Sequence, residues 1–168
     1  MNQTAQTANN HYEDTAEARE RLHLVTFRLL GEEFGLPILD VREIIRMTDI
    51  TPVPQAPGFV EGVINLRGQI IPVVDLRKRF GISANEANEE TRIIVVELRT
   101  AVIGLIVDEV SEVLRVPADT VAPPPSLVAG SIGSEYIKGI GHYDEKMIIL
   151  IDMRKVFNED EVGAIEGM

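Results

Sequence analysis

The sequence of 168 residues contains no cysteine, which excludes disulfide bonds and thiolate chemistry and is typical of a reducing compartment. Tryptophan is absent too, and only 5% of the chain is aromatic against a hydrophobic fraction of 45%, so we expect a core of valine, isoleucine and leucine. No apolar run approaches the roughly 20 residues that a transmembrane helix needs, so we expect no insertion into a membrane. Cations are scarce: 16 lysines and arginines face 27 acidic residues, and the net charge of −11 opposes binding to nucleic acid or anionic lipid.

An internal repeat organises the chain. Residues 59–80 and 136–157 align without a gap at a spacing of 77, and six positions are identical: Gly62/Gly139, Ile71/Ile148, Asp75/Asp152, Arg77/Arg154, Lys78/Lys155 and Phe80/Phe157. The preceding segments align at a spacing of 69, with the identical pairs Gly35/Gly104, Leu36/Leu105, Val41/Val110, Glu43/Glu112 and Arg46/Arg115. The chain is therefore a two-copy repeat, and the difference between the spacings gives the second copy about eight extra residues.

Each copy shows several short strands separated by turns rich in Gly and Pro. In the first copy, residues 22–30 and 34–38 predict a β-hairpin, and residues 60–74 predict a second hairpin. The segment 39–47 fits two helical turns or a short strand equally well, because its apolar positions are too few to decide the period. Pro72, inside the last strand of this copy, indicates an edge strand or a bulge.

These patterns predict an all-β fold with short helical turns. Two tandem small barrels are expected to pack on each other, because a unit of about 65 residues has a marginal core alone. We expect the barrels to comprise approximately residues 21–90 and 91–157, with the termini free to cross between them. Residues 1–20 are polar and lack periodicity, which predicts a disordered tail, and residues 158–168 predict a frayed acidic tail.

No residue pattern indicates catalysis or metal binding. His23 and His142 are interpreted as ordinary surface histidines, since no ligand spacing accompanies them. Asp75 and Asp152 occupy the same place before an Arg-Lys helical turn, which favours twin N-caps over a catalytic pair. The basic run at 77–79 is interpreted as a solvated helical turn. We therefore expect no enzymatic activity, no metal and no cofactor.

Two features favour a binding function. The turn NLRG at 65–68 breaks the repeat, because the second copy has HYDE at 142–145. The segment VREII at 41–45 places apolar side chains between charges of both signs. One interpretation is a plain hairpin tip with an amphipathic core segment. The other is an apolar groove with a polar rim that receives a partner helix. The residues alone leave both interpretations open.

Several of these motifs resemble those of the CheW family of chemotaxis coupling proteins, and they occur in the family's order over residues 22–157. They are VREII at 41–45, PGFVEGVINLRG at 57–68, IPVVDLR at 71–77 and GLIVDEV at 104–110. The resemblance implies two five-stranded SH3-like barrels around a shared apolar seam, without catalytic activity. It also implies two protein partners, which are the cytoplasmic hairpin tip of methyl-accepting chemoreceptors and the regulatory domain of the histidine kinase CheA.

By motif match, the resemblance assigns receptor contact to a groove between the barrels, where an ion pair between Glu43 and Arg67 fixes the neighbouring turn. The receptor-binding residues implied here are Val41, Glu43, Ile44, Gly62, Asn65 and Arg67. The kinase-binding residues implied here are Val121, Pro125 and Leu127. Ala122 stands where the family pattern has a basic residue.

The resemblance further implies a cytoplasmic protein that is monomeric when isolated and is recruited to membrane-associated receptor arrays. The alternative from a different class is a small β-barrel that binds a ligand or nucleic acid. That alternative is disfavoured because the chain lacks the basic stripe and the stacking aromatic residues that such barrels use.

Overall fold

The structure is a computed structural model that describes residues 20–83, 86–124 and 134–168. The predicted disorder of residues 1–20 therefore concerns a segment that, apart from Glu20, lies outside the described residues. Strands dominate the described part of the chain, and the predicted all-β class is confirmed.

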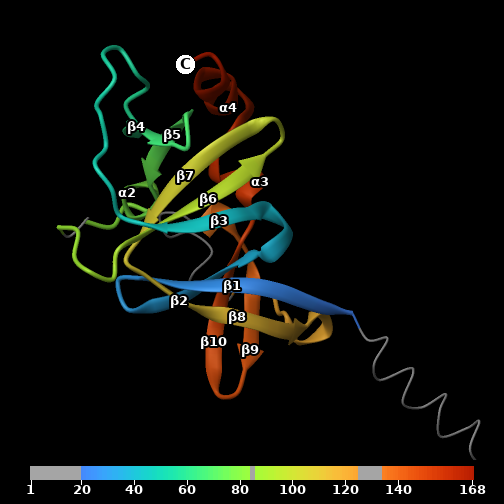
Figure 1. Cartoon of the computed structure of the whole chain (residues 1–168). Coiled ribbons are helices and arrows are strands. Elements are labelled where there is room, and N and C mark those ends of the chain that lie inside the picture. The colour runs from blue at the N-terminus through green and yellow to red at the C-terminus, as the bar shows by residue number, and fades with distance from the viewer. Residues whose placement is uncertain (1–19, 84–85, 125–133) are drawn as a thin grey trace, which may run out of the picture.

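The strands form two five-stranded sheets, shown one above the other in Figure 1. Lobe A is the sheet with the strand order β8 (Glu109–Pro117), β1 (Arg21–Leu29), β2 (Glu32–Pro37), β10 (Lys146–Ile151) and β9 (Ile137–Tyr143). Lobe B is the sheet with the strand order β3 (Val41–Arg46), β6 (Arg92–Leu98), β7 (Ala101–Val107), β5 (Gln69–Asp75) and β4 (Val60–Leu66). Among the described residues, strand pairing leaves each sheet open at its outer strands instead of closing a complete barrel.

The two lobes are built by exchange between the sequence copies. Lobe A combines the first hairpin of copy one, β1–β2, with the last three strands of copy two, β8–β10, and lobe B combines β6–β7 with β3–β5. The joins are equivalent and parallel, β10 with β2 and β5 with β7. Parallel neighbours cannot be joined by a tight turn, so the copies interlock. The lobes therefore do not coincide with a division near residue 90, because the chain crosses between them, the arrangement that the sequence left open for the termini.

Three apolar clusters fill the interior. The central cluster takes residues from both sheets, such as Phe27 of lobe A and Ile94 of lobe B, and it is the predicted apolar seam between the lobes. Lobe B has a cluster of its own that contains Ile93, and lobe A has one that contains Leu24. Ile93 and Ile94 face different clusters because successive side chains of a strand alternate. Sheets buried on both faces explain the nearly continuous apolar strands of the sequence.

Short helices complete the fold. They are η1 (Ile38–Asp40), α2 (Leu76–Arg79), η2 (Ala118–Thr120), η3 (Ser134–Tyr136), α3 (Met153–Val156) and α4 (Glu159–Glu166). Asp75 and Asp152 each accept a hydrogen bond at 3.0 Å from the backbone N–H two residues later, which confirms both predicted N-caps. Within the described residues, no helix combines the length and the hydropathy that crossing a membrane would require.

Helix α4 differs from the frayed tail predicted for residues 158–168. Asn158 and Glu161 form a reciprocal capping box, in which each side chain accepts a hydrogen bond from the other residue's backbone N–H. Val162 and Ile165, three residues apart on one helix face, are buried in the central cluster. Figure 1 shows α4 beside β7. The burial of these two apolar side chains holds the segment on the core, although its acidic composition predicted a solvated tail.

The basic run at 77–79 is a solvated turn only at Lys78, so that prediction is wrong for its two arginines. Arg77 is buried in an ion pair with Asp75. Arg79 is paired with Glu161 of α4. Its guanidinium lies 5.2 to 5.8 Å from the centres of three aromatic rings, those of Phe59, Tyr136 and Phe157. Arg77 also donates a hydrogen bond to Asp108, 31 residues away along the chain, so both arginines have long-range partners that shield them from water.

Strand β5, which contains Pro72, is an internal strand between β7 and β4, so the edge alternative is wrong, whereas the β4–β5 ladder does contain a register shift, between Val60 and Gly62 of the partner strand. The parallel register with β7 begins at Val73 and ends at Asp75. Pro72 lies immediately before that ladder, and the N–H that proline lacks therefore falls outside it.

Candidate functional site

Strand β3 lies at one edge of lobe B, where a β-bulge controls the direction of its side chains. The register with β6 shifts after Val41, so that Arg42 is the extra residue. Val41 and Ile44, three residues apart, therefore pair with Val96 and Ile94, which both belong to the central cluster. Val41 is half-buried against that cluster, whereas Ile44 is 39% exposed. Ile44 is thus an accessible apolar side chain at the rim of the junction between the lobes.

The turn between β4 and β5 presents Arg67 to the surroundings. Arg67 and Gly68 both have positive φ, at 51° and 85°, as a type I′ hairpin turn requires. The Gly68 N–H donates a hydrogen bond of 2.8 Å to Asn65 Oδ1. Asn65 therefore stabilises the turn itself, and the Arg67 side chain, 72% exposed, is the group that the turn offers to a partner.

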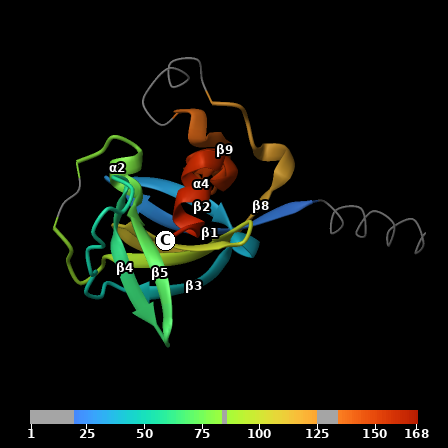
Figure 2. The same ribbon diagram turned by 90° about the horizontal axis from the view of Figure 1, so that it is seen from above.

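Arg67 and Glu43 link the two outer strands of lobe B, and the predicted ion pair is present. Arg67 Nη1 donates to Glu43 Oε1 at 3.2 Å, and Nη2 donates to Oε2 in a bidentate arrangement. The hydrogen bond with Glu43 is the main cause that raises the pKa of Arg67 above its ordinary value. Figure 2 shows the β4–β5 hairpin reaching toward β3, so this pair brings opposite edges of the sheet together.

Copy two has no equivalent of this pair. The repeat places Glu112 where copy one has Glu43, and it places Asp144 where copy one has Arg67, so both equivalent positions carry a carboxylate. The β9–β10 turn nevertheless keeps the same backbone shape, since Asp144 and Glu145 have φ of 48° and 51°. The hairpin geometry is therefore common to both copies, and the cation at its tip belongs to copy one alone.

Gly62 permits two backbone segments to approach closely, because the connector between β3 and β4 passes over β4 at this residue. Thr51 forms a β-bridge to the neighbouring residue of β4. A Cβ at Gly62 would overlap the Thr51 carbonyl oxygen and would lie 2.8 Å from Ile50 Cγ2. The equivalent Gly139 has the same environment, with a Cβ placed 2.7 Å from Val121 Cγ1. Of the six residues assigned to receptor contact, buried Gly62 thus presents no side chain, and it permits a close backbone approach.

The connector assigned to kinase contact begins after η2 and packs on lobe A. Val121 is half-buried against the apolar cluster of that lobe. Ala122 is exposed and forms a β-bridge to β9. Pro125 and Leu127 lie outside the described residues. The described part of this connector therefore belongs to a different lobe from the Glu43–Arg67 pair.

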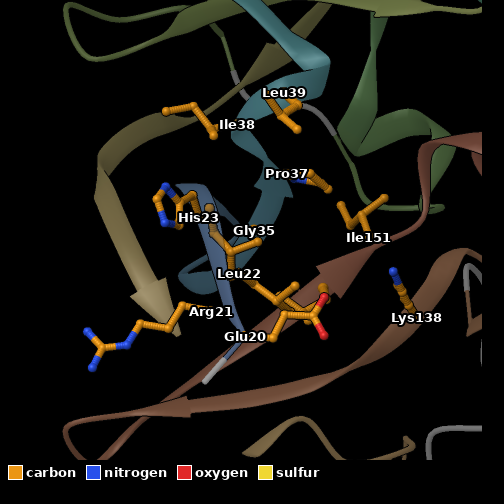
Figure 3. Close-up of a pocket in the computed structure, with 12 residues that line it drawn as sticks. Glu20, Arg21, Leu22, His23, Gly35, Pro37, Ile38, Leu39, Lys138 and Ile151 are labelled. Carbon is orange, nitrogen blue, oxygen red and sulfur yellow. The ribbon is translucent and has the colours of Figure 1, made fainter. Parts of the chain in front are cut away.

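A cavity of about 410 Å³ lies beside η1 in lobe A. Figure 3 shows Ile38 and Leu39 on one side of it and the polar ends of Glu20 and Lys138 on the other. Leu39, the middle residue of η1, is 95% exposed, and β3 begins two residues after it. Residue pattern alone does not predict Leu39 as a surface residue, because the segment 39–47 fits a helical and a strand period equally well.

The fold and these contacts define a pseudo-symmetric, two-lobed β-sheet protein with an exposed apolar side chain at the junction of its lobes and an ion pair across one lobe. Comparison with known families is consistent with that architecture. The family model described as the CheW-like domain matches residues 23–161, most of the chain, and the chain belongs to this family.

Individual relatives agree with the assignment. The chain is 35% identical to the chemotaxis protein CheW of Treponema pallidum over 153 residues, which cover 89% of each protein. It is 38% identical to the CheW of Rhizobium meliloti, with 84% of this chain and 90% of the relative covered. Among solved structures, the scaffolding protein TtCheW of Thermoanaerobacter tengcongensis matches with a TM-score of 0.75 and 42% identity, covering 84% of this chain and 96% of that one.

Proposed function

We propose that this chain is a non-catalytic chemotaxis adaptor that couples the cytoplasmic hairpin tip of transmembrane chemoreceptors to the histidine kinase CheA. The observation that carries the proposal is the exposed Ile44 on the face of β3 toward the junction between the lobes, next along the strand to Glu43, whose ion pair with Arg67 links the edges of lobe B. Membership of the CheW-like family supports the same role, since relatives carry the names of chemotaxis and scaffolding proteins.

The receptor surface is built around strand β3. Ile44 loses its remaining exposed area when an apolar stripe of a receptor helix docks on the rim, which is the usual mode of helix-in-groove recognition. Arg67 engages Glu43 through Nη1 and Nη2, and its high exposure leaves further N–H donors for polar groups of the helix. Val41 and Asn65 hold this surface in place. Val41 packs against the central cluster, and Asn65 stabilises the turn by accepting a hydrogen bond from the Gly68 N–H.

The kinase surface is the connector that contains Val121, Pro125 and Leu127. An adaptor needs two partners bound at once, so its two surfaces must not overlap. Val121 packs on lobe A, whereas Ile44 and Arg67 belong to lobe B, which is the separation that simultaneous binding requires. In the cell, the protein acts in the cytoplasm as a monomer that is recruited to membrane-associated receptor arrays.

Pull-down of the full chain with a receptor signalling fragment and with the kinase regulatory domain tests the proposal. Ile44→Asp is the informative variant, because Ile44 is exposed, whereas the half-buried Val41 would also affect folding. Val113→Asp is the matched control, since Val113 is the repeat equivalent of Ile44 on β8 and is 56% exposed. We expect Ile44→Asp to lose the receptor fragment and to retain the kinase domain, while Val113→Asp retains both.

The alternative outcomes are distinct. If the wild-type chain binds neither protein, the adaptor role is wrong, and a screen for thermal stabilisation by small ligands and oligonucleotides follows. If Val113→Asp weakens receptor binding as much as Ile44→Asp does, the receptor does not dock on β3. Arg67→Ala is expected to weaken receptor binding and to leave the free energy of unfolding almost unchanged, because an exposed ion pair contributes little to stability.

A further inference from the structure

Strand β3 presents two exposed arginines beside Ile44. Arg42 and Arg46 flank Ile44 at alternate positions of the strand, and all three side chains are exposed. Within the described residues, neither guanidinium forms an ion pair or a side-chain hydrogen bond, unlike Arg67 nearby, which is paired with Glu43. Since Glu43 is already matched by Arg67, the surface around Ile44 carries two unmatched positive charges.

The two positive charges on β3 contrast with the net negative charge of the chain. The net charge is −11, so exposed cations are the minority on its surface. The repeat shows that the fold does not need both arginines, because copy two has Ser111 in place of Arg42 and keeps a cation, Arg115, only at the equivalent of Arg46. Arg42 is also the bulged residue of β3, a position where side-chain identity is free of pairing constraints.

The spacing of the two arginines suits a helix that lies along β3. Four residues of strand span about 13 Å at roughly 3.3 Å per residue. That length matches about two and a half turns of an α-helix at 5.4 Å per turn. Carboxylates two to three turns apart on the docked helix would therefore reach both guanidinium groups, with the apolar contact to Ile44 between them.

We propose that Arg42 and Arg46 bind two carboxylates of the receptor segment that docks on Ile44, so that the partner is an acidic amphipathic helix. The inference rests on the proposed receptor contact and adds its chemistry: an apolar stripe flanked by aspartate or glutamate. A guanidinium can donate two parallel hydrogen bonds to one carboxylate, and complementary charge selects among helices of similar apolar pattern.

Calorimetric titration of the full chain with a chemoreceptor signalling fragment, repeated from low to high NaCl concentration, tests the proposal. We expect affinity to fall as salt rises, and the double variant Arg42→Glu/Arg46→Glu to bind about tenfold or more weakly with a flatter salt dependence. Arg42→Lys/Arg46→Lys keeps the charge but loses the bidentate geometry, so it should bind more weakly than wild type and more tightly than Arg42→Glu/Arg46→Glu. Arg115→Glu, the repeat equivalent on lobe A, is the control and should bind as wild type does.

The result separates this inference from the proposed function. If wild type and the Arg42→Glu/Arg46→Glu variant bind the fragment equally, with the same salt dependence, the receptor contact stands and the acidic-helix inference is overturned. An equal loss in Arg115→Glu overturns it as well, because the effect would then reflect total charge. If wild type does not bind, both the proposed function and the inference fail. Thermal unfolding of each variant checks that the exposed changes leave the fold intact.

Discussion

Asp75 does more than cap helix α2, and its repeat partner Asp152 allows the two contributions to be separated. Both carboxylates accept the N-cap hydrogen bond at 3.0 Å. Asp75 also accepts hydrogen bonds from Arg77 Nε at 3.0 Å and Nη2 at 2.9 Å, and the side chains of this pair are 5% and 6% exposed. Arg154, the equivalent of Arg77, is 78% exposed, and its Nε lies 3.6 Å from Asp152 Oδ1. The second aspartate is therefore a cap with only a loose surface pair.

The expected losses of stability differ accordingly. Asp152→Ala removes a cap, which costs about 1 kcal/mol. Asp75→Ala removes the cap and also leaves the buried Arg77 short of a partner, a change that costs about 3 to 5 kcal/mol where no partner remains. Arg77 Nη1 still donates to Asp108 Oδ1 at 2.8 Å, so we place the total near the lower end, at about 3 kcal/mol.

Urea denaturation of the two variants and wild type, followed by circular dichroism, measures the difference. Asp75→Ala should lower the free energy of unfolding by about 2 kcal/mol more than Asp152→Ala does. Equal losses for the two variants would refute the reasoning, because the buried ion pair would then add nothing beyond the cap. Arg77→Met provides a second check, since it removes the cation and keeps the aspartate that caps α2.

Three further predictions concern stability. Gly62→Ala should cost about 1 to 3 kcal/mol in urea denaturation, because its Cβ would meet the Thr51 carbonyl group; an unchanged midpoint would contradict the close approach. Val162→Ala should cost about 2 kcal/mol, whereas Gly163→Ala, at an open and exposed helix position, should add about 0.5 to 1 kcal/mol; equal effects would mean that α4 does not pack on the core. Burial, the largest cause, raises the pKa of Asp40 above its ordinary 3.8, so its protonated form favours the folded state and this stability is lost as pH rises through that raised pKa. The melting temperature of Asp40→Asn relative to wild type should therefore increase from acid to neutral pH, and a constant difference would contradict the shift.

The sequence by itself determined the features that depend on local pattern. The two-copy repeat, the β1–β2 and β4–β5 hairpins and the caps at Asp75 and Asp152 follow from residue identities within a few positions of one another, because turn and cap geometry is a property of a short segment. The position and partners of the receptor-contact residues were supplied by family resemblance, and the Glu43–Arg67 pair is the part of that expectation that the geometry shows directly.

The structure also explains why the segment 39–47 was ambiguous. Val41 and Ile44 are three residues apart, a spacing typical of one face of a helix. A strand places such residues on opposite faces, but the bulge at Arg42 restores the same face. The β-bulge thus changes the spacing of the apolar residues along the strand, and the residue types alone do not predict a bulge at this position.

Only the tertiary structure decided which segments meet. The exchange of hairpins between lobes, the burial of Arg77 beside Asp108 and the packing of Val162 on the central core all join positions far apart in the chain. Periodicity predicts which face of a helix or strand is apolar, but it does not predict which other element will pack against that face. The acidic character of residues 158–168 suggested solvent exposure, yet two apolar side chains at helical spacing were enough to bury one face of α4. Long-range contact is therefore what distinguishes a solvated tail or a surface arginine from a part of the core.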